Sequence, residues 1–238
     1  MIYEERILTA NGSYTKPKPL TPSGIVVHST GVNQRRIQAY WTQFNAPTLR
    51  ASVHGFIGIN DNGKLAYRKT LPYLIQCWGC GSGTKGSYNA SHIQFEICED
   101  LTSRDWTQET YAAALEVCTS LCREFGIRPE AVVCHAEAHA AGYGSNHGDV
   151  MHWWPKFGLS MDKFRKELRI RLGDEDMAER FKTINDVPAS LRKETQELIT
   201  AGVLNGKGGT AGLDVTEDML RTLIIAKRYA DKAVKDHG

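Results

Sequence analysis

The sequence Ala-Val-Val-Cys-His-Ala-Glu-Ala-His at residues 131–139 leads directly from an apolar run into a group of histidines. A second segment, Ser-Asn-His-Gly-Asp-Val-Met-His-Trp-Trp at residues 145–154, follows closely, so the two hold four of the chain's eight histidines. Imidazole and carboxylate groups are common zinc ligands, and a catalytic zinc needs three protein ligands. The pattern therefore predicts a metal site at the end of a buried strand, with a further ligand supplied from elsewhere in the chain.

A second short apolar run, residues 24–27, ends at His28 and is followed by a polar turn at residues 29–31. Histidines at the ends of two buried strands can converge on one point, which makes His28 a candidate ligand. A lone histidine at a strand end is, however, more often a hydrogen-bonded structural residue than a ligand. Spacing alone leaves both interpretations open.

A third run, within residues 89–98, places a carboxylate in an apolar strand. Ile93, Phe95 and Ile97 alternate onto one face, so Gln94 and Glu96 point to the other face. Such a carboxylate is costly to bury unless it is paired or used in chemistry. We therefore expect Glu96 to belong to a functional site.

A long helix is predicted to begin at a capping box formed by Asp105 and Gln108 and to end at Gly126. Residues 33–44 show the same helical spacing of apolar side chains, whereas residues 1–23 are polar and should wrap around the surface as extended chain. Strands that alternate with such helices indicate an α/β fold with a mixed central β-sheet flanked by helices.

Six short motifs, in this order along the chain, resemble the type 2 N-acetylmuramoyl-L-alanine amidases, which share the peptidoglycan-recognition-protein fold. The resemblance covers roughly residues 20 to 170 and is closest to phage and prophage endolysins. The motifs are Val27–Gly31, Ser52–Ile57, Asp61–Gly63, Trp78-Gly79, Asn89–Glu96 and His135–Trp154.

The resemblance implies a zinc site made by His28, His135 and Asp149. Family members commonly write the last part as Lys-x-Asp-Pro-Gly, whereas this chain has His-Gly-Asp-Val-Met at residues 147–151. His147 therefore stands where the family has its lysine, and it is also an alternative third zinc ligand. The tyrosine that often precedes the motif histidine at His54 is replaced by Val53.

The activity implied by the resemblance is zinc-dependent hydrolysis of the amide bond between N-acetylmuramic acid and L-alanine in bacterial peptidoglycan. Glu96 would take a proton from the attacking water and deliver it to the leaving nitrogen, and His147 would stabilise the developing oxyanion. Substrate contacts are expected from His54, Trp78 and Asn89, with a structural role equally open for Trp78.

Two alternatives accompany this interpretation. Some proteins of this fold bind peptidoglycan without cutting it and lack the third metal ligand, so the presence of all three ligands here favours an enzyme. Cys77 and Cys80 form a C-x-x-C pair that would suit a structural zinc site, although a single pair is weak evidence.

Composition and charge exclude several other classes. The net charge of +2, with scattered basic residues, argues against a nucleic-acid-binding protein. No apolar run approaches the ~20 residues of a transmembrane helix. The first residues lack the basic and then apolar plan of a signal peptide. We therefore expect synthesis in the cytoplasm and action on the cell wall after holin-type release.

The composition of the chain changes after Leu172. We predict a zinc amidase catalytic domain at residues 1–172, a linker at residues 173–185 that begins with an acidic break, and a small helical module at residues 186–238. The module should hold helices at residues 188–201 and 216–234, joined by a glycine-rich loop at residues 205–209. It weakly resembles one S-layer-homology unit, so we expect cell-wall binding or homodimerisation.

Overall fold

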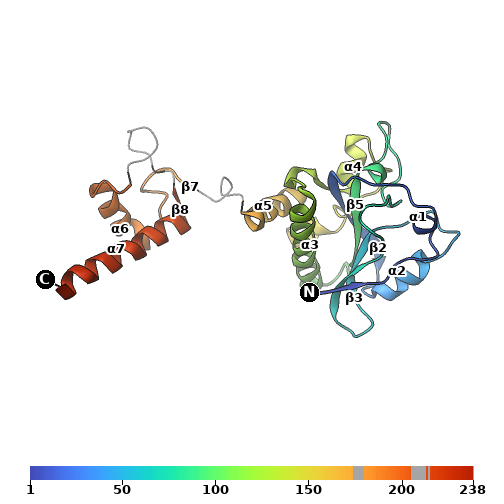
Figure 1. The fold of residues 1–238 in the computed structure, drawn as a ribbon, viewed down its shortest axis with the longest axis horizontal. Helices are drawn as coiled ribbons and strands as arrows, with labels where there is room; N and C mark the ends of the chain where they lie inside the picture. Colours follow the sequence, from blue (N-terminus) through green and yellow to red (C-terminus); the bar gives the residue numbers. More distant parts are fainter. Residues whose placement is uncertain (174–179, 205–212, 214, 238) are drawn as a thin grey trace. The chain divides into compact units, whose positions relative to one another are not determined.

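The computed structural model describes residues 1–173, 180–204, 213 and 215–237. The chain forms two compact units, Met1–Leu172 (unit 1) and Gly173–Gly238 (unit 2), and each is described by itself (Figure 1). The elements of unit 1 are β1 (Ile2–Glu5), α1 (Gly12–Thr15), β2 (Gly24–Asn33), α2 (Ile37–Phe44), β3 (Gly55–Ile59), β4 (Leu65–Lys69), η1 (Tyr88–Ala90), β5 (His92–Glu99), α3 (Arg104–Phe125), η2 (Pro129–Ala131), β6 (Val132–Cys134), α4 (His135–Ala141), η3 (Trp154–Phe157) and α5 (Met161–Leu172).

The sheet of unit 1 has the strand order β1-β4-β3-β5-β2-β6. The β3–β4 pair is antiparallel, and the other neighbouring pairs are parallel. The turn between β3 and β4 ends at Gly63, whose φ of +73° suits a residue without a Cβ atom. A mixed sheet with flanking helices confirms the predicted fold class.

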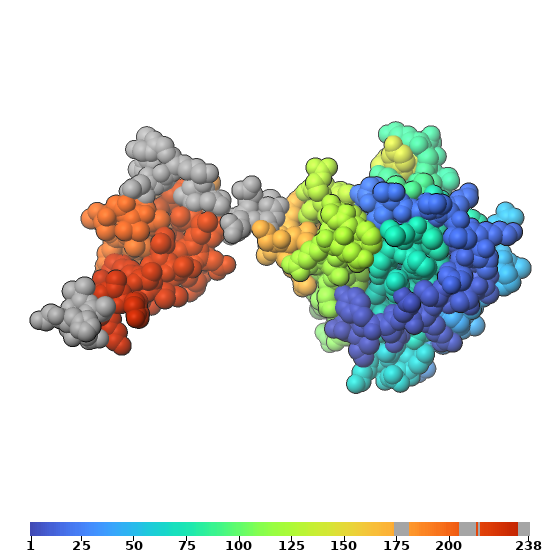
Figure 2. Space-filling model, in the orientation of Figure 1, coloured from blue at the N-terminus to red at the C-terminus, as the bar shows by residue number. Residues whose placement is uncertain are grey.

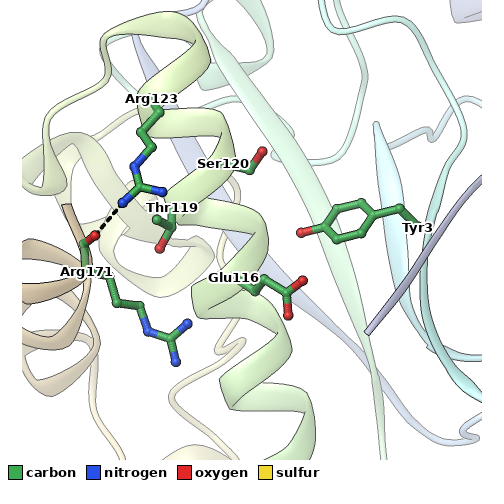
Figure 3. Close-up of a pocket in the computed structure, with 6 residues that line it drawn as sticks. All are labelled: Tyr3, Glu116, Thr119, Ser120, Arg123 and Arg171. Carbon is green, nitrogen blue, oxygen red and sulfur yellow. Dashed lines mark hydrogen bonds between the residues drawn. The ribbon is translucent and has the colours of Figure 1, made fainter.

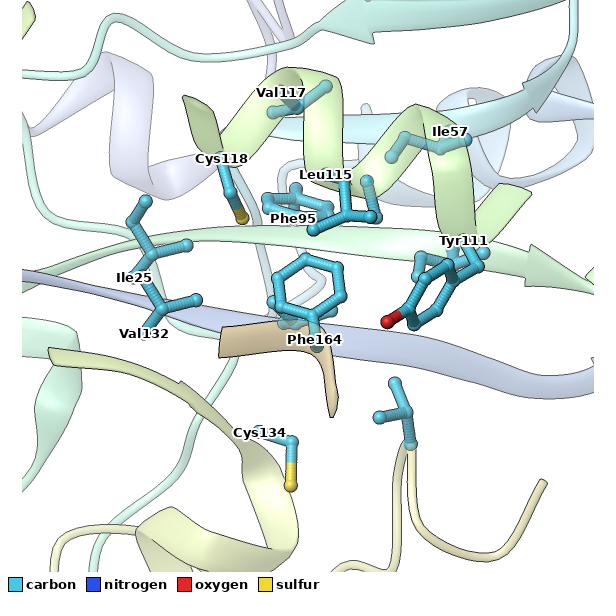
Figure 4. Packing of buried hydrophobic residues seen from close by; sticks show 14 of the residues in the cluster. Ile25, Ile57, Phe95, Tyr111, Leu115, Val117, Cys118, Val132, Cys134 and Phe164 are labelled. Carbon is cyan, nitrogen blue, oxygen red and sulfur yellow. The ribbon is translucent and has the colours of Figure 1, made fainter. Parts of the chain in front are cut away.

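The two faces of the sheet carry different side chains because neighbouring residues of a strand point in opposite directions. Ile93, Phe95 and Ile97 of β5 are buried in the main apolar cluster together with side chains of α3 and α5. Figure 4 shows residues such as Phe95, Leu115 and Phe164 meeting in this cluster. The opposite face packs against α2, and it carries Gln94 and Glu96, as the alternation predicts.

This cluster is the main source of stability in unit 1. Phe95 and Phe164 are fully buried, and burying a side chain of that size contributes about 1.5–3 kcal/mol relative to exposure. The helices that cover the cluster keep a polar outer face. Within the described residues, no helix is both long and apolar enough to cross a membrane.

The N-terminal segment differs from its prediction. Figure 2 shows it, in blue, running over the outside of unit 1. Its first residues nevertheless form β1, which pairs with β4 at one edge of the sheet, and both Leu8 and Leu20 are buried. The apolar residues scattered among the polar ones therefore tie this segment into the fold.

Unit 2 contains β7 (Arg180–Phe181), α6 (Ala189–Thr200), β8 (Val215–Thr216) and α7 (Glu217–His237). Its apolar cluster includes Phe181, which is buried, and Ile184, which is partly buried. Residues 180–185 thus belong to this unit rather than to the linker predicted at 173–185. Residues 174–179 and the predicted loop at 205–209 lie outside the described residues. Wall binding and dimerisation by this unit stay predictions.

Helix α3 is capped two residues earlier than the sequence suggests. Ser103 is the N-cap residue, and its side chain accepts a hydrogen bond from the N–H of Trp106. The predicted capping box of Asp105 and Gln108 is therefore wrong, because Asp105 already lies in the first helical turn. The predicted end is confirmed, since Gly126 adopts the left-handed conformation with φ of +66°.

We predict that Ser103→Ala lowers the free energy of unfolding by about 1 kcal/mol, the usual cost of losing an N-cap side chain. Asp105→Asn should cost less, because it removes only an exposed charge near the helix N-terminus. Urea unfolding of both variants and the wild type measures the difference. An equal or larger loss for Asp105→Asn would contradict the assignment of Ser103 as the cap.

Candidate metal centre

Strand pairing brings His28 and His135 together. β6 runs parallel to β2 with Val27 opposite Cys134, so the next residue of each chain segment, His28 and His135, lies at the same level. Asp149 reaches them from the following loop, where its carbonyl accepts a hydrogen bond of 3.1 Å from the N–H of Ala136. The short apolar runs predicted from the sequence are the strands that set this register.

The ligand atoms of the three residues form a tight buried group. His28 Nδ1 lies 3.1 Å from both Asp149 Oδ2 and His135 Nδ1, and His135 Nδ1 lies 3.6 Å from Asp149 Oδ2. The three residues are 1%, 3% and 8% exposed in the order His28, His135 and Asp149. Such a group could hold a metal ion.

The spacing of these atoms fits a small tetrahedral cation. With metal–ligand bonds of about 2.0–2.1 Å, two ligand atoms of a tetrahedral zinc lie about 3.3 Å apart. The observed separations of 3.1, 3.1 and 3.6 Å bracket this value. Two imidazoles and one carboxylate are also a usual zinc ligand set.

The charge of the Asp149 carboxylate is stabilised within the group. Burial would raise its pKa, but hydrogen bonds and attraction from His135 and His28 outweigh burial and hold the pKa well below its usual range. Asp149 is therefore ionised at neutral pH, as a metal ligand must be.

Glu96 lies beside this group on the same face of the sheet. In the strand ladder it is opposite His28 on β2 and Phe56 on β3. Its Oε2 atom is buried and has no hydrogen-bond partner among the described residues. Burial raises the pKa of Glu96 well above its usual value, and the negative charges of Asp149 and Glu99 raise it further. A carboxyl group whose pKa is raised in this way is a candidate for proton transfer.

His147 lies at the exposed side of the centre. Its ring stacks on the ring of His135, with centroids 4.8 Å apart and 17° between the planes. The converging ligand atoms belong to His28, His135 and Asp149, and His147 is not part of that group. The geometry thus favours Asp149 over His147 as the third ligand and leaves the His147 ring free to approach a bound molecule.

His54 and Asn89 both use polar atoms for hydrogen bonds inside the protein. His54 is fully buried, and both ring nitrogens form hydrogen bonds. Nε2 donates to the carbonyl of Ile75, and Nδ1 accepts from the N–H of Gln94. The Asn89 side-chain oxygen accepts hydrogen bonds from Cys80 N–H and from Gln94 Nε2. These contacts indicate structural roles, and substrate contact by His54 and by the half-buried Asn89 stays a prediction.

Trp78 is half-buried and packs near Gly12 of α1, where an added Cβ atom would lie 3.8 Å from the indole ring. The backbone N–H of Trp78 donates to the carbonyl and hydroxyl oxygens of Ser52. These contacts indicate a structural role, and substrate contact by Trp78 stays a prediction.

Sequence reasoning missed two residues that contact the histidines. Gln94 Oε1 lies 2.9 Å from His28 Nε2, and Ser145 Oγ lies 3.2 Å from His135 Nε2. The alternation in β5 placed Gln94 on the correct face, which was the available signal for it. Nothing in the sequence pattern pointed to Ser145, since a serine in a polar loop is common.

Neither the Cys77 and Cys80 pair nor a surface pocket contributes a ligand to this centre. Cys77 and Cys80 belong to separate apolar clusters, and the metal-ligating group found among the described residues contains neither of them. A pocket of about 510 Å³ has no histidine among its lining residues (Figure 3). It is lined by Tyr3, Glu116, Thr119, Ser120, Arg123 and Arg171.

Comparisons with known proteins agree with this geometry. The family described as Amidase_2, N-acetylmuramoyl-L-alanine amidase, matches residues 18–150. The catalytic domain of XlyA has a similar structure, with a TM-score of 0.56 and 20% identity over 71% of this chain and 99% of that chain. The Staphylococcus aureus hydrolase AmiA, in complex with its ligand, gives a TM-score of 0.58 and 18% identity over 74% of this chain and 85% of that chain.

A mutant endolysin from Bacillus subtilis gives a TM-score of 0.53 and 20% identity over 69% of this chain and 99% of that chain. At these identities the structural likenesses show a common fold. No curated protein sequence matches the chain significantly.

We predict that His54 makes the protein less stable in mild acid. Burial lowers its pKa to about 4, whereas the pKa in the unfolded chain is about 6.5. Between these values the unfolded chain binds a proton that the folded chain does not, so stability falls as the pH drops. The expected loss from His54 is about 2 kcal/mol between pH 7 and pH 5.

Urea unfolding with a chelator present measures this loss. His54→Gln should reduce the pH dependence by that amount, whereas the same substitution at the exposed His139 should leave it unchanged. His92, whose pKa burial also lowers to about 4, accounts for part of the remaining slope. An unchanged pH dependence in His54→Gln would contradict the prediction.

We predict that Asp149→Ala weakens zinc binding by at least ~10–100-fold. That range is the usual cost of losing a residue that only contacts a metal ligand, and this substitution removes a ligand itself. His147→Ala should bind zinc nearly as well as the wild type. Competition with a chromophoric chelator measures both affinities. The reverse order of effects would make His147, rather than Asp149, the third ligand.

Proposed function

The chain belongs to the Amidase_2 family of N-acetylmuramoyl-L-alanine amidases, and from this premise we propose that it is a zinc-dependent, endolysin-type enzyme that cleaves bacterial peptidoglycan. The bond cleaved is the amide between N-acetylmuramic acid and L-alanine of the stem peptide. The observation that carries the proposal is the convergence of His28 Nδ1, His135 Nδ1 and Asp149 Oδ2 next to Glu96.

His28, His135 and Asp149 would hold zinc, which supplies polarisation of the scissile carbonyl and a lowered pKa for the attacking water. Both histidines present Nδ1 to the same point, and the ionised Asp149 balances part of the cation's charge. The main apolar cluster supports the centre from the opposite face of the sheet, so that its ligands are held on regular strands and at a helix start.

Glu96 is proposed as the group that moves the proton. Its carboxylate takes a proton from water as the water oxygen forms a bond to the carbonyl carbon. It then gives that proton to the amide nitrogen as the carbon–nitrogen bond breaks. The products are the carboxyl group of the lactyl ether and the free amino group of L-alanine. The raised pKa of Glu96 supports this double use, because the same group must both accept and release a proton.

His147 is proposed to stabilise the negative charge that develops on the carbonyl oxygen. Its exposed ring is held in place by stacking on His135, so a ring N–H can donate to that oxygen. Loss of one such donor typically lowers turnover by about 10²–10³-fold. This function replaces that of the lysine found in the family motif.

A second candidate function is peptidoglycan recognition without cleavage. It would need the fold but not a complete set of ligands. The presence of three converging ligand atoms and a neighbouring buried carboxyl group favours the enzyme over this alternative.

We predict that Glu96→Gln binds zinc like the wild type but loses turnover by about 10²–10⁴-fold, the usual contribution of a positioned acid or base. The assay incubates purified peptidoglycan with each protein and measures newly freed L-alanine amino groups. Zinc content is measured on the same samples.

The Asp149→Ala variant serves as the matched control, since it should lose zinc and turnover together. Normal turnover in Glu96→Gln would remove Glu96 from the mechanism. A wild type that binds peptidoglycan and zinc but frees no L-alanine would instead support recognition without cleavage.

A further inference from the structure

The backbone of one residue, Cys80, is linked through hydrogen-bonded side chains to both histidines of the metal centre. Its N–H donates to Asn89 Oδ1 over 2.9 Å. Its carbonyl accepts from the N–H of Ser145 over 2.9 Å and from the Ser145 hydroxyl over 3.3 Å. Because a backbone N–H can only donate and a carbonyl can only accept, these contacts fix the direction of every bond beyond them.

The first branch leads from Cys80 to His28. The atom of Asn89 that accepts from Cys80 N–H must be the side-chain oxygen, and the atom of Gln94 that contacts this oxygen at 2.9 Å must be its NH₂ group. The other end of the Gln94 amide is therefore oxygen, and it lies 2.9 Å from His28 Nε2. His28 must then carry a hydrogen on Nε2, so its neutral ring, the form that binds a metal, has the lone pair on Nδ1 facing the centre.

The second branch leads from Cys80 to His135. The Ser145 hydroxyl donates its hydrogen to the Cys80 carbonyl. Its oxygen can then accept from His135 Nε2, which lies 3.2 Å away. His135 therefore also carries a hydrogen on Nε2, and its neutral ring presents the lone pair of Nδ1. Both branches produce the tautomer that the observed Nδ1 spacing of 3.1 Å needs for a shared cation.

We propose that Asn89, Gln94 and Ser145 are positioning residues that set the tautomer and orientation of His28 and His135. Their hydrogen bonds begin at the backbone N–H and carbonyl of Cys80. The inference rests on the proposed metal site and deepens it. None of the three residues belongs to the group of converging ligand atoms. They act through the histidines, in the way that outer-shell partners generally tune metal ligands.

The glycines on either side of Cys80 support this assignment. A Cβ atom on Gly79 would lie 2.7 Å from Gln94 Oε1, and one on Gly81 would lie 2.5 Å from Ser145 Oγ. Gly81 also has a φ of +64°, which disfavours any other residue. The backbone thus approaches both amide and hydroxyl partners closely, and side chains at these two positions would push the partners away from the histidines.

The test compares substitutions that remove or keep a hydrogen bond of the network. Ser145→Ala and Gln94→Met each cut one branch with little change in volume, and both should weaken zinc binding by about 10–100-fold. Ser91→Ala is the matched control, because Ser91 contacts His92, a histidine outside the metal centre, over 2.8 Å. It should change zinc affinity less than about twofold, well below that range.

Asn89 provides a test of direction. Asn89→Asp keeps an oxygen that accepts from Cys80 and Gln94, so its zinc affinity should stay near that of the wild type. Asn89→Leu removes the acceptor and should resemble Gln94→Met. Competition with a chromophoric chelator measures all affinities, with the folded state of each variant checked by its circular dichroism spectrum.

A second measurement is independent of zinc and of activity. Long-range ¹H–¹⁵N spectra of the metal-free protein should show hydrogen on Nε2 of both His28 and His135, and Gln94→Met should lose this preference at His28 alone. Hydrogen on Nδ1 only in the wild type, or unchanged zinc affinity in both Ser145→Ala and Gln94→Met, would overturn the proposal. Tight zinc binding without release of L-alanine would refute the proposed function but leave this inference intact.

Discussion

The parallel pairing of β2 with both β5 and β6 is the constraint on which the rest of the structure depends. It sets His28 level with Glu96 on one side and close to His135 on the other. Because side chains alternate along a strand, a slip of one residue in either pair would turn a ligand or the acid into the apolar cluster. The register that forms the core is therefore the same register that forms the metal centre.

One face of the sheet stabilises the fold, and the other face carries the groups of the metal centre. The face toward α3 and α5 is closely packed and apolar, and it supplies the free energy that holds the strands in place. The opposite face buries histidines, carboxyl groups and an amide, which are unfavourable to bury unless each has a partner. Hydrogen bonds to Gln94 and Ser145 satisfy the Nε2 atoms of His28 and His135. The Oε2 atom of Glu96, which has no hydrogen-bond partner in the described part of the chain, marks where chemistry is expected.

Much of this arrangement could be predicted from the sequence, and the exceptions have physical causes. Strand alternation predicted the face of the sheet that carries Glu96, and the short apolar runs predicted His28 and His135 at strand ends. Both predictions were possible because the patterns depend on local spacing. The hydrogen bonds of His54 and Asn89 could not be predicted, because motif position says nothing about which atoms are already bonded within the protein. The part played by Cys80 could not be foreseen, since it uses only the backbone of that residue.

The ends of the strand order have a consequence for behaviour at high concentration. The outermost strands, β1 with four residues and β6 with three, are both short, and β1 carries Glu4 and Glu5 in ion pairs with Arg68 and Lys69. A short or charged edge offers little template for pairing with another chain. Unit 1 therefore carries its mixed sheet with built-in protection against aggregation through its edges.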